Sequence, residues 1–331
     1  MTLTAKERFF ALLDGKPADR PAVINPVSLA THESLSALKL DFSKVHLAPD
    51  NAAALAGYGY EKLRFDSVMP YFSVVAEGAA LGAAIDWGNN KSMPAIRSAI
   101  FDEPDHVKIP AGYLDRPSMR CVLEALKLLF ARYNGKALII GKAMGPWTLC
   151  MSLYGMENTL VDTIENRDKL KHMLCSFLDF TGMFIEAQLY SGADMVTVAD
   201  HVTRNLVGPY VYEEFVMPLH RRLNDKFPGK LILHCCGNTE DRVGLFAKAG
   251  FNLYHFESSN DILIMLERAG NMKLTGCLNN PELLMKGNPE DVIAETERII
   301  RLGVDIVSPE CAVPLLTPNR NLTAIVKGAF F

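Results

Sequence analysis

The sequence lacks the features that mark membrane and secreted proteins. No stretch of its 331 residues approaches the roughly 18 uninterrupted apolar residues that a membrane span needs. Residues 1–8 do not form the long apolar core of a signal peptide. The seven cysteines are odd in number and irregularly spaced, which does not fit a disulfide framework. We therefore expect a cytoplasmic protein with reduced thiols and no membrane partner.

Strong charge of one sign and phosphate-binding loops are also missing. The formal net charge of −4 is too small to favour nucleic acid or an acidic surface as a partner. The segment 145–147, Gly-Pro-Trp, matches neither a P-loop nor a dinucleotide-binding pattern. What remains is an ordinary globular composition, 49% hydrophobic and 22% charged, in a chain long enough for a sizeable core.

Apolar strand-like runs alternate with helical segments along the whole chain. The runs are 21–24, 63–68, 137–140, 194–198, 231–234, 253–256, 273–275 and 305–307. Eight such units predict parallel βα repeats and a (β/α)8 TIM barrel, with an N-terminal elaboration because residues 25–135 exceed what two plain units need. A doubly wound open sheet is the structural alternative. We expect residues 1–331 to form a single domain.

Three cysteine or histidine side chains stand where predicted strands end. His234 and Cys236 close the fifth run, and Cys311 follows the eighth. In an extended H-x-C segment both side chains fall on one side of the backbone, as two ligands of one ion require. Glu257 follows the sixth run, so four donors can converge on the active-site rim of a barrel. Thiolate, imidazole and carboxylate are zinc ligands, and the pattern favours a zinc site with a position open to substrate.

The alternative interpretation is that these side chains belong to the core. We expect this for Cys121, Cys150 and Cys175, which lie in helix-like apolar stretches. It also holds for Cys235, whose side chain should face away from its neighbours, and for Cys277 near the rim.

Two further polar residues follow predicted strands. Asp200 comes after the fourth run, where a carboxylate acts as a general base, orients a substrate or simply caps a loop. Asn279 comes after the seventh run, where it binds a ligand or shapes the turn before Pro281. Asp200 is our candidate catalytic residue and Asn279 our candidate substrate-binding residue.

Several ordered segments resemble the uroporphyrinogen decarboxylase superfamily along nearly the whole chain. They are Arg8 with Leu12, 15–21 (GKPADRP), 145–149 (GPWTL), 192–194 (GAD), 233–238 (LHCCGN), 276–281 and 308–311 (SPEC) with Thr317-Pro318. The histidine–cysteine–cysteine triad is similar to that of the methylcobamide:coenzyme M methyltransferase branch. Cys235 departs from that branch, where an apolar residue is common at this position. It offers a second thiol that could bind the metal in place of Cys236.

The decarboxylases themselves bind a polycarboxylate tetrapyrrole through an arginine-rich segment after the first strand. Here the corresponding segment, 24–29, reads Ile-Asn-Pro-Val-Ser-Leu and contains no arginine. Their aspartate after the second strand is also missing, since the nearest positions are Phe72 and Ser73. Loss of the cations that neutralise the carboxylates argues against uroporphyrinogen as the substrate.

The resemblance implies zinc held by His234, Cys236 and Cys311, with a small thiol in the open position and a further carboxylate ligand at Glu257. We expect Glu257 to occupy the metal when the thiol is absent and to yield when it arrives. The zinc-bound thiolate would attack the methyl group of a methylcobamide. The resemblance places that methylcobamide on a separate corrinoid protein docked at the barrel mouth, since this chain has no Asp-x-His-x-x-Gly loop.

Other functions and assemblies remain open from the sequence. The acceptor is coenzyme M, another thiol or tetrahydrofolate. The alternatives to a methyltransferase are a non-catalytic corrinoid- or zinc-binding accessory protein and a decarboxylase of a small tetrapyrrole-like acid. Monomer and homodimer are both compatible with the sequence.

Overall fold

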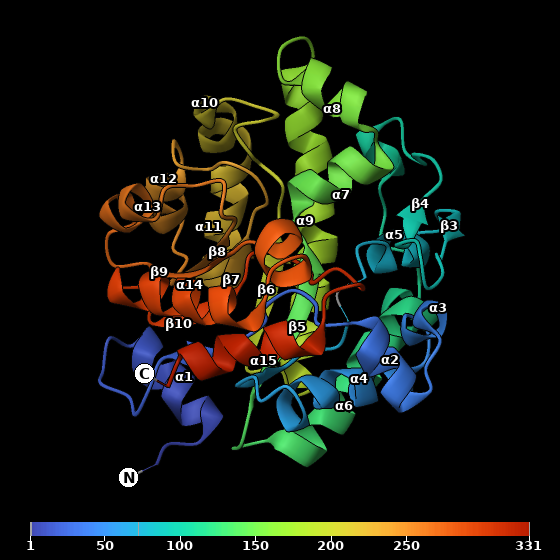
Figure 1. Cartoon of the computed structure of the whole chain (residues 1–331). Coiled ribbons are helices and arrows are strands. Elements are labelled where there is room, and N and C mark those ends of the chain that lie inside the picture. Colours follow the sequence, from blue (N-terminus) through green and yellow to red (C-terminus); the bar gives the residue numbers. More distant parts are fainter. Residues whose placement is uncertain (1, 72, 331) are drawn as a thin grey trace.

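The barrel predicted from the sequence is confirmed by the computed structural model, which describes residues 2–71 and 73–330 (Figure 1). Within those residues, eight parallel strands follow one another in the order β1-β10-β9-β8-β7-β6-β5-β2. The strands are β1 Ala22–Val23, β2 Ser67–Val68, β5 Leu138–Met144, β6 Met195–Ala199, β7 Leu231–His234, β8 Leu253–Phe256, β9 Lys273–Leu278 and β10 Ile306–Pro309. Each overlaps one of the eight predicted runs. The strand order never reverses, so the doubly wound alternative is wrong.

The first and last strands in this order, β1 and β2, are joined by hydrogen bonds around Asp66. The backbone N–H of Asp66 donates to the carbonyl of Val23 over 2.6 Å, and the N–H of Val23 donates to the Asp66 carboxylate over 2.8 Å. The N–H of Asn25 donates to the hydroxyl of Ser67. These bonds bring the first strand beside the second, so the eight strands enclose a nearly closed barrel.

Helices surround the strands, as Figure 1 shows, with most crossovers helical. The longer outer helices are α1 Ala5–Leu13, α6 Pro117–Tyr133, α9 Arg167–Tyr190, α11 Met217–Lys226, α13 Ile262–Ala269, α14 Pro289–Arg301 and α15 Asn319–Gly328. Shorter segments are α7 Pro146–Leu153, α8 Met156–Asp162, α10 Pro209–Val211, η3 Tyr212–Val216, α12 Val243–Lys248 and η4 Asn280–Met285. Asn288 caps α14, since its side chain accepts from the N–H of Asp291 in the first turn.

The N-terminal elaboration consists of two insertions around β2. The first contains α2 His32–Leu38, α3 Phe42–Val45 and α4 Pro49–Glu61; the second contains α5 Ala76–Ala80, β3 Ile85–Asp86, β4 Ala95–Ile96, η1 Pro104–His106 and η2 Tyr113–Asp115. Strands β3 and β4 form an antiparallel pair at the right of Figure 1 that the sequence analysis did not predict. Phe72, one of the positions compared above with the decarboxylase aspartate, lies outside the described residues.

The core fills the barrel and the space beneath the helices. All seven residues of β5 are buried, which is typical of a parallel strand covered on both sides. The same burial holds for β6, β7, β8 and β10. In the described part of the chain, no helix is both long and apolar enough to cross a bilayer.

Candidate metal centre

The predicted ligands meet at the carboxyl-terminal rim of the barrel. His234 is the last residue of β7, and Cys236 follows two positions later. Glu257 directly follows β8, and Cys311 lies two positions beyond β10. Parallel strands end at the same rim, so residues far apart in sequence come together there.

The three principal donors form a compact triangle. His234 Nε2 lies 3.1 Å from Cys236 Sγ and 3.6 Å from Cys311 Sγ, and the two sulfur atoms are 3.5 Å apart. Zinc with bonds of about 2.0–2.1 Å to nitrogen and about 2.3 Å to sulfur separates tetrahedral ligands by roughly 3.6–3.8 Å. The triangle therefore fits one tetrahedral zinc ion, with small movements of the donors.

The orientation of His234 also suits a metal ligand. Its Nδ1 lies 3.3 Å from the backbone carbonyl of His255, so Nδ1–H donates to this oxygen and the lone pair of Nε2 faces the sulfurs. Burial lowers the pKa of His234, which favours the neutral imidazole that a metal requires. The neighbouring ring of His255 is held in turn, because its Nε2 donates to the carbonyl of Pro309 over 2.7 Å.

The two sulfurs act as a coupled pair. Their mutual hydrogen bond, together with burial, raises the pKa of the Cys236 thiol. The same bond from Cys236 holds the pKa of Cys311 well below its usual range, and the charge interaction with His234 favours the Cys311 thiolate further. The contact between the two sulfurs therefore favours one thiol and one thiolate.

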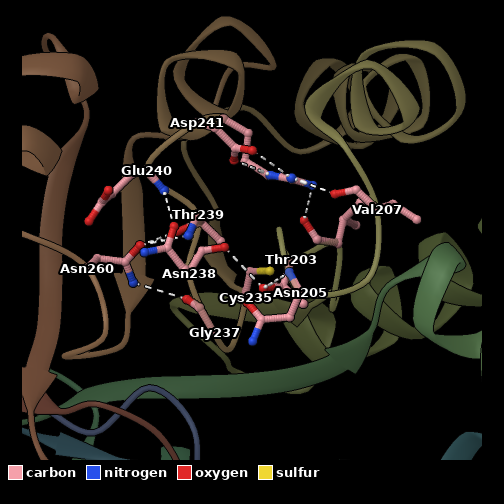
Figure 2. Close-up of polar contacts among 12 residues, drawn as sticks. Thr203, Asn205, Val207, Cys235, Gly237, Asn238, Thr239, Glu240, Asp241 and Asn260 are labelled. Carbon is pink, nitrogen blue, oxygen red and sulfur yellow. Dashed lines mark hydrogen bonds and ion pairs between the residues drawn. The ribbon is translucent and has the colours of Figure 1, made fainter.

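The loop after β7 is held rigid by side chains from neighbouring loops (Figure 2). Asn260 donates to the carbonyl of Gly237 and accepts from the N–H of Thr239 over 2.7 Å. Gly237 has φ +80°, and a Cβ there would lie 2.5 Å from the hydroxyl of Thr203. Glycine is thus required both by the backbone and by the close approach. These contacts fix the backbone of the loop that carries Cys236.

Arg242 ties this loop to the loop that follows β6. Its guanidinium donates to the carbonyls of Val202 and Val207, each over 2.7 Å, and pairs with Asp241 (Figure 2). The Arg242 side chain is fully buried. The loops after β6 and β7 are therefore held as one unit.

His201 joins the cluster, although sequence reasoning did not place it there. Its Nε2 lies 3.1 Å from Cys236 Sγ, and donor atoms of His201, His234 and Cys236 all lie within 4.8 Å of one another. Its position one residue beyond Asp200, at the end of a predicted strand, was the available signal. Burial lowers the pKa of His201.

Glu257 lies beside the two sulfurs of the cluster. Its carboxylate and the sulfurs of Cys236 and Cys311 lie within 4.8 Å of one another. Among the residues that the structure describes, no side chain or backbone group forms a hydrogen bond with that carboxylate. Glu257 is therefore placed to approach a metal, and its ligation stays a prediction.

Asp200 lies behind the cluster and is almost fully buried. One carboxylate oxygen accepts from the N–H and the hydroxyl of Thr148, and the other lies 3.0 Å from His220 Nε2. The Thr148 hydroxyl in turn accepts from the N–H of His201 over 2.8 Å. Through these contacts Asp200 positions the loop that carries His201. A direct catalytic role for Asp200 stays a prediction.

Asn279 is engaged in the turn that begins η4. Its side-chain oxygen accepts from the N–H of Glu282, and its amide nitrogen donates to the hydroxyl of Ser258. Asn279 is not among the residues that line the cavity described next. The structure therefore supports the turn-shaping alternative, and substrate binding by Asn279 stays a prediction.

The remaining cysteines have the core environment that the sequence indicated, with one exception. Cys121, Cys150, Cys235 and Cys277 are buried. Burial raises the pKa of each of these four thiols. Cys235 therefore does not compete with Cys236 for the site. Cys175 differs because it is only partly buried on α9, where Arg222 approaches its sulfur.

A cavity of about 750 Å³ opens directly beside the cluster. His201, Cys236 and Glu257 form its polar wall. The other lining residues, chiefly apolar, are Val74, Val75, Pro94, Ala95, Ile96, Met144, Thr148, Met151, Ser152, Met156, Thr203, Leu206 and Gly237. None of these described lining residues is an arginine or a lysine. The cavity suits a small, largely apolar molecule better than a polycarboxylate.

Comparison with known proteins agrees with this architecture. The sequence profile of the uroporphyrinogen decarboxylase family (URO-D) matches residues 4–329. The chain is 27% identical over 332 residues to the methylcobamide:CoM methyltransferase MtbA of Methanosarcina acetivorans, covering 98% of this chain and 97% of that protein. It is also 27% identical to a methylated-thiol–coenzyme M methyltransferase of Methanosarcina mazei, covering 98% and 89%. A solved methyltransferase from Methanosarcina mazei superposes with a TM-score of 0.95 at 24% identity, covering 99% of this chain and 98% of that one, and shares the fold.

Proposed function

The chain belongs to the uroporphyrinogen decarboxylase family, and from this premise we propose that it is a zinc-dependent corrinoid methyltransferase. It would move a methyl group from a methylcobamide, carried by a separate corrinoid protein, to a small thiol such as coenzyme M. The observation that carries the proposal is the triangle of His234, Cys236 and Cys311, whose donor atoms lie 3.1–3.6 Å apart beside an apolar cavity. The similarity to methylcobamide:CoM methyltransferases supports the reaction type.

His234, Cys236 and Cys311 would hold the zinc, which would bind the substrate thiol and lower its pKa so that the thiolate is available at neutral pH. The chain's own contribution is the arrangement of the donors. The carbonyl of His255 fixes the tautomer of His234, and the loop contacts of Arg242 and Asn260 fix Cys236. Because these groups are arranged before the substrate arrives, little reorganisation accompanies the reaction.

The cavity would supply a dry surface for the substrate thiol and the reacting face of the corrin. Its methionine and aliphatic walls exclude water from the sulfur, which keeps the thiolate weakly hydrated and reactive. Val74 and Met156, which line the cavity, are 42% and 52% exposed and extend the apolar surface to its rim. We place the docking surface of the corrinoid protein at this rim. Glu257 would leave the metal when the thiol enters.

One observation weighs against a decarboxylase of a tetrapyrrole-like acid. Such an enzyme needs cations near its substrate, and the described residues that line the cavity include no arginine or lysine. A corrinoid- or zinc-binding accessory protein without turnover is distinguished by the methyl-transfer assay below. Tetrahydrofolate as acceptor is tested directly by the experiment below.

The test measures zinc and methyl transfer in one set of proteins. We expect about one zinc per chain in the wild type and nearly none in Cys236→Ala, with Cys175→Ala as the matched control that keeps its zinc. Methylcobalamin should methylate coenzyme M, another thiol or tetrahydrofolate in a zinc-dependent manner, and the preferred acceptor identifies the substrate. A wild type that binds zinc but transfers no methyl group to any acceptor would favour the accessory protein. A wild type without zinc would contradict the proposal.

A further inference from the structure

His201 contacts the same sulfur as the ligand His234 but differs from it in its surroundings. Both histidines place Nε2 3.1 Å from Cys236 Sγ. Nδ1 of His234 donates to a backbone carbonyl, which leaves Nε2 without a proton. Among the residues that the structure describes, no group accepts a hydrogen bond from Nδ1 of His201. A metal-bound histidine almost always donates its other N–H to an acceptor, so His201 lacks the support of a ligand.

The environment of His201 instead favours the tautomer with the proton on Nε2. A thiolate only accepts hydrogen bonds, so a 3.1 Å contact between Nε2 and the Cys236 thiolate requires the N–H on Nε2. The nearest acceptor for that N–H is the sulfur of Cys236. The backbone N–H of His201 donates to the hydroxyl of Thr148, and that hydroxyl donates to Asp200. Arg242 holds the loops of His201 and Cys236 together, so the contact does not depend on a mobile segment.

We infer that His201 is a positioning residue that donates a hydrogen bond to the Cys236 thiolate and keeps the methyl group from being transferred to that sulfur. The inference rests on the proposed zinc site. A site that methylates a thiol faces a selectivity problem, because two protein thiolates lie beside the substrate thiolate. A hydrogen bond withdraws charge from a thiolate and makes it a weaker nucleophile.

The two protein sulfurs differ in their side-chain neighbours. Cys311 Sγ lies 3.6 Å from Nε2 of His234, which carries no proton, and in the described structure it forms no hydrogen bond with His201. Cys236 receives its bond from a side chain, which substitution can remove. Cys311 therefore serves as an internal reference within each variant.

The experiment challenges the zinc-loaded protein with limiting methyl iodide and measures methylation at positions 236 and 311 by peptide mass spectrometry. In the reaction a sulfur lone pair forms the S–CH3 bond, the carbon–iodine bond breaks, and iodide leaves. Wild type is compared with His201→Leu, which fills similar space without a donor, and with His201→Gln, which keeps an N–H at similar reach. Zinc content and melting temperature are measured on every sample.

We expect the ratio of methylation at Cys236 to that at Cys311 to rise about tenfold in His201→Leu, the scale of a lost hydrogen bond to a charged group. The ratio should return close to wild type in His201→Gln, with about one zinc per chain throughout. If His201→Leu does not fold, His201→Ala replaces it as the variant without a donor.

Four results would overturn the inference, the last of them together with the proposed function. If the ratio of methylation at Cys236 to that at Cys311 is unchanged in His201→Leu, the hydrogen bond from His201 does not protect Cys236. The proposed function would still hold. If the ratio rises equally in His201→Leu and His201→Gln, the effect comes from easier access of methyl iodide to Cys236 and not from loss of the N–H. Loss of zinc in both variants would make His201 a ligand. A wild type without zinc would overturn this inference and the proposed function together.

Discussion

The two ends of the barrel hold buried polar clusters of opposite character. At the amino-terminal end, Asp66 accepts hydrogen bonds from Arg8, Arg20 and the backbone of Val23. Arg8 also forms a two-bond contact with Asp19. Charges of opposite sign neutralise one another there, and each carboxylate is occupied by a neighbour of the same chain.

At the carboxyl-terminal end the candidate metal donors are concentrated, and under the proposed function they bind an external partner. His234, Cys236 and Cys311 present lone pairs and thiols toward one another, and no arginine or lysine is among the described residues that line the adjacent cavity. One end is completed by its own residues, whereas the other, under the proposed function, is completed by a cation and a substrate. In barrel enzymes this division separates stability from chemistry.

The largest effect should come from Cys311→Ala, which removes a proposed ligand. We expect zinc to fall from about one per chain to nearly zero, measured by elemental analysis, because only two strong donors of the triangle remain. The melting temperature should equal that of chelator-treated wild type, while far-ultraviolet circular dichroism shows a folded barrel. Cys175→Ala is the control. Full zinc retention in Cys311→Ala would show that Cys311 is not a zinc ligand, and the proposed difference between the two ends of the barrel would fail.

A substitution at the other end should change stability without changing metal content. Asp66→Ala leaves the buried guanidinium of Arg8 without this partner, and we expect a loss of about 3–5 kcal/mol in the free energy of unfolding, measured by denaturant titration. Asp14→Ala removes an exposed pair with Lys16 and should cost less than about 1 kcal/mol. Zinc per folded chain should stay near one in both. Zinc loss in Asp66→Ala would show that the two ends are coupled.

Glu257→Gln tests whether the carboxylate is an exchangeable ligand. With thiol present, the variant should keep about one zinc per chain. Without thiol, a chelator should remove the zinc roughly tenfold faster than from wild type, since the loss of a group near a metal lowers affinity by about 10–100-fold. Complete zinc loss in the presence of thiol would instead make Glu257 a permanent ligand.

The smallest effect concerns acid stability at the amino-terminal end. The hydrogen bond from Arg8 holds the pKa of Asp19 below its usual range. A carboxylate whose pKa is lowered by folding stabilises the protein above its unfolded value and loses that contribution as the pH falls through its folded value. The gap in melting temperature between wild type and Asp19→Asn should therefore narrow below about pH 4. A gap that stays constant to pH 2 would assign the stability to packing; Asp19 is partly exposed, so the effect is modest.

Most of the fold could be predicted because its signals are local. Each of the eight predicted apolar runs overlaps a barrel strand, since buried parallel strands need continuous apolar sequence. The β3–β4 pair was not predicted, because each strand has two residues and neither strand is buried. Such strands have no continuous apolar run in the sequence. Its register, Ile85 against Ile96, depends on the path of the connecting chain.

The candidate site was predictable only in part. The H-x-C spacing places His234 and Cys236 on one side of an extended backbone, and the structure has their donor atoms 3.1 Å apart. Asp200 was visible as a polar residue after a strand, but its bonds to Thr148 and His220 depend on helices that sequence spacing does not position.

The sequence by itself determined the barrel, the ligand types and the strand ends on which they stand, because alternation and burial act between near neighbours. Only the tertiary structure decided which donors meet. The approach of His201 to Cys236, and that of Cys311 to both Cys236 and His234, depend on strand order, on a buried arginine that joins two loops, and on side-chain rotamers. Those features are set by packing among residues far apart in the chain, where a shift of about one ångström separates a metal ligand from a hydrogen-bond donor.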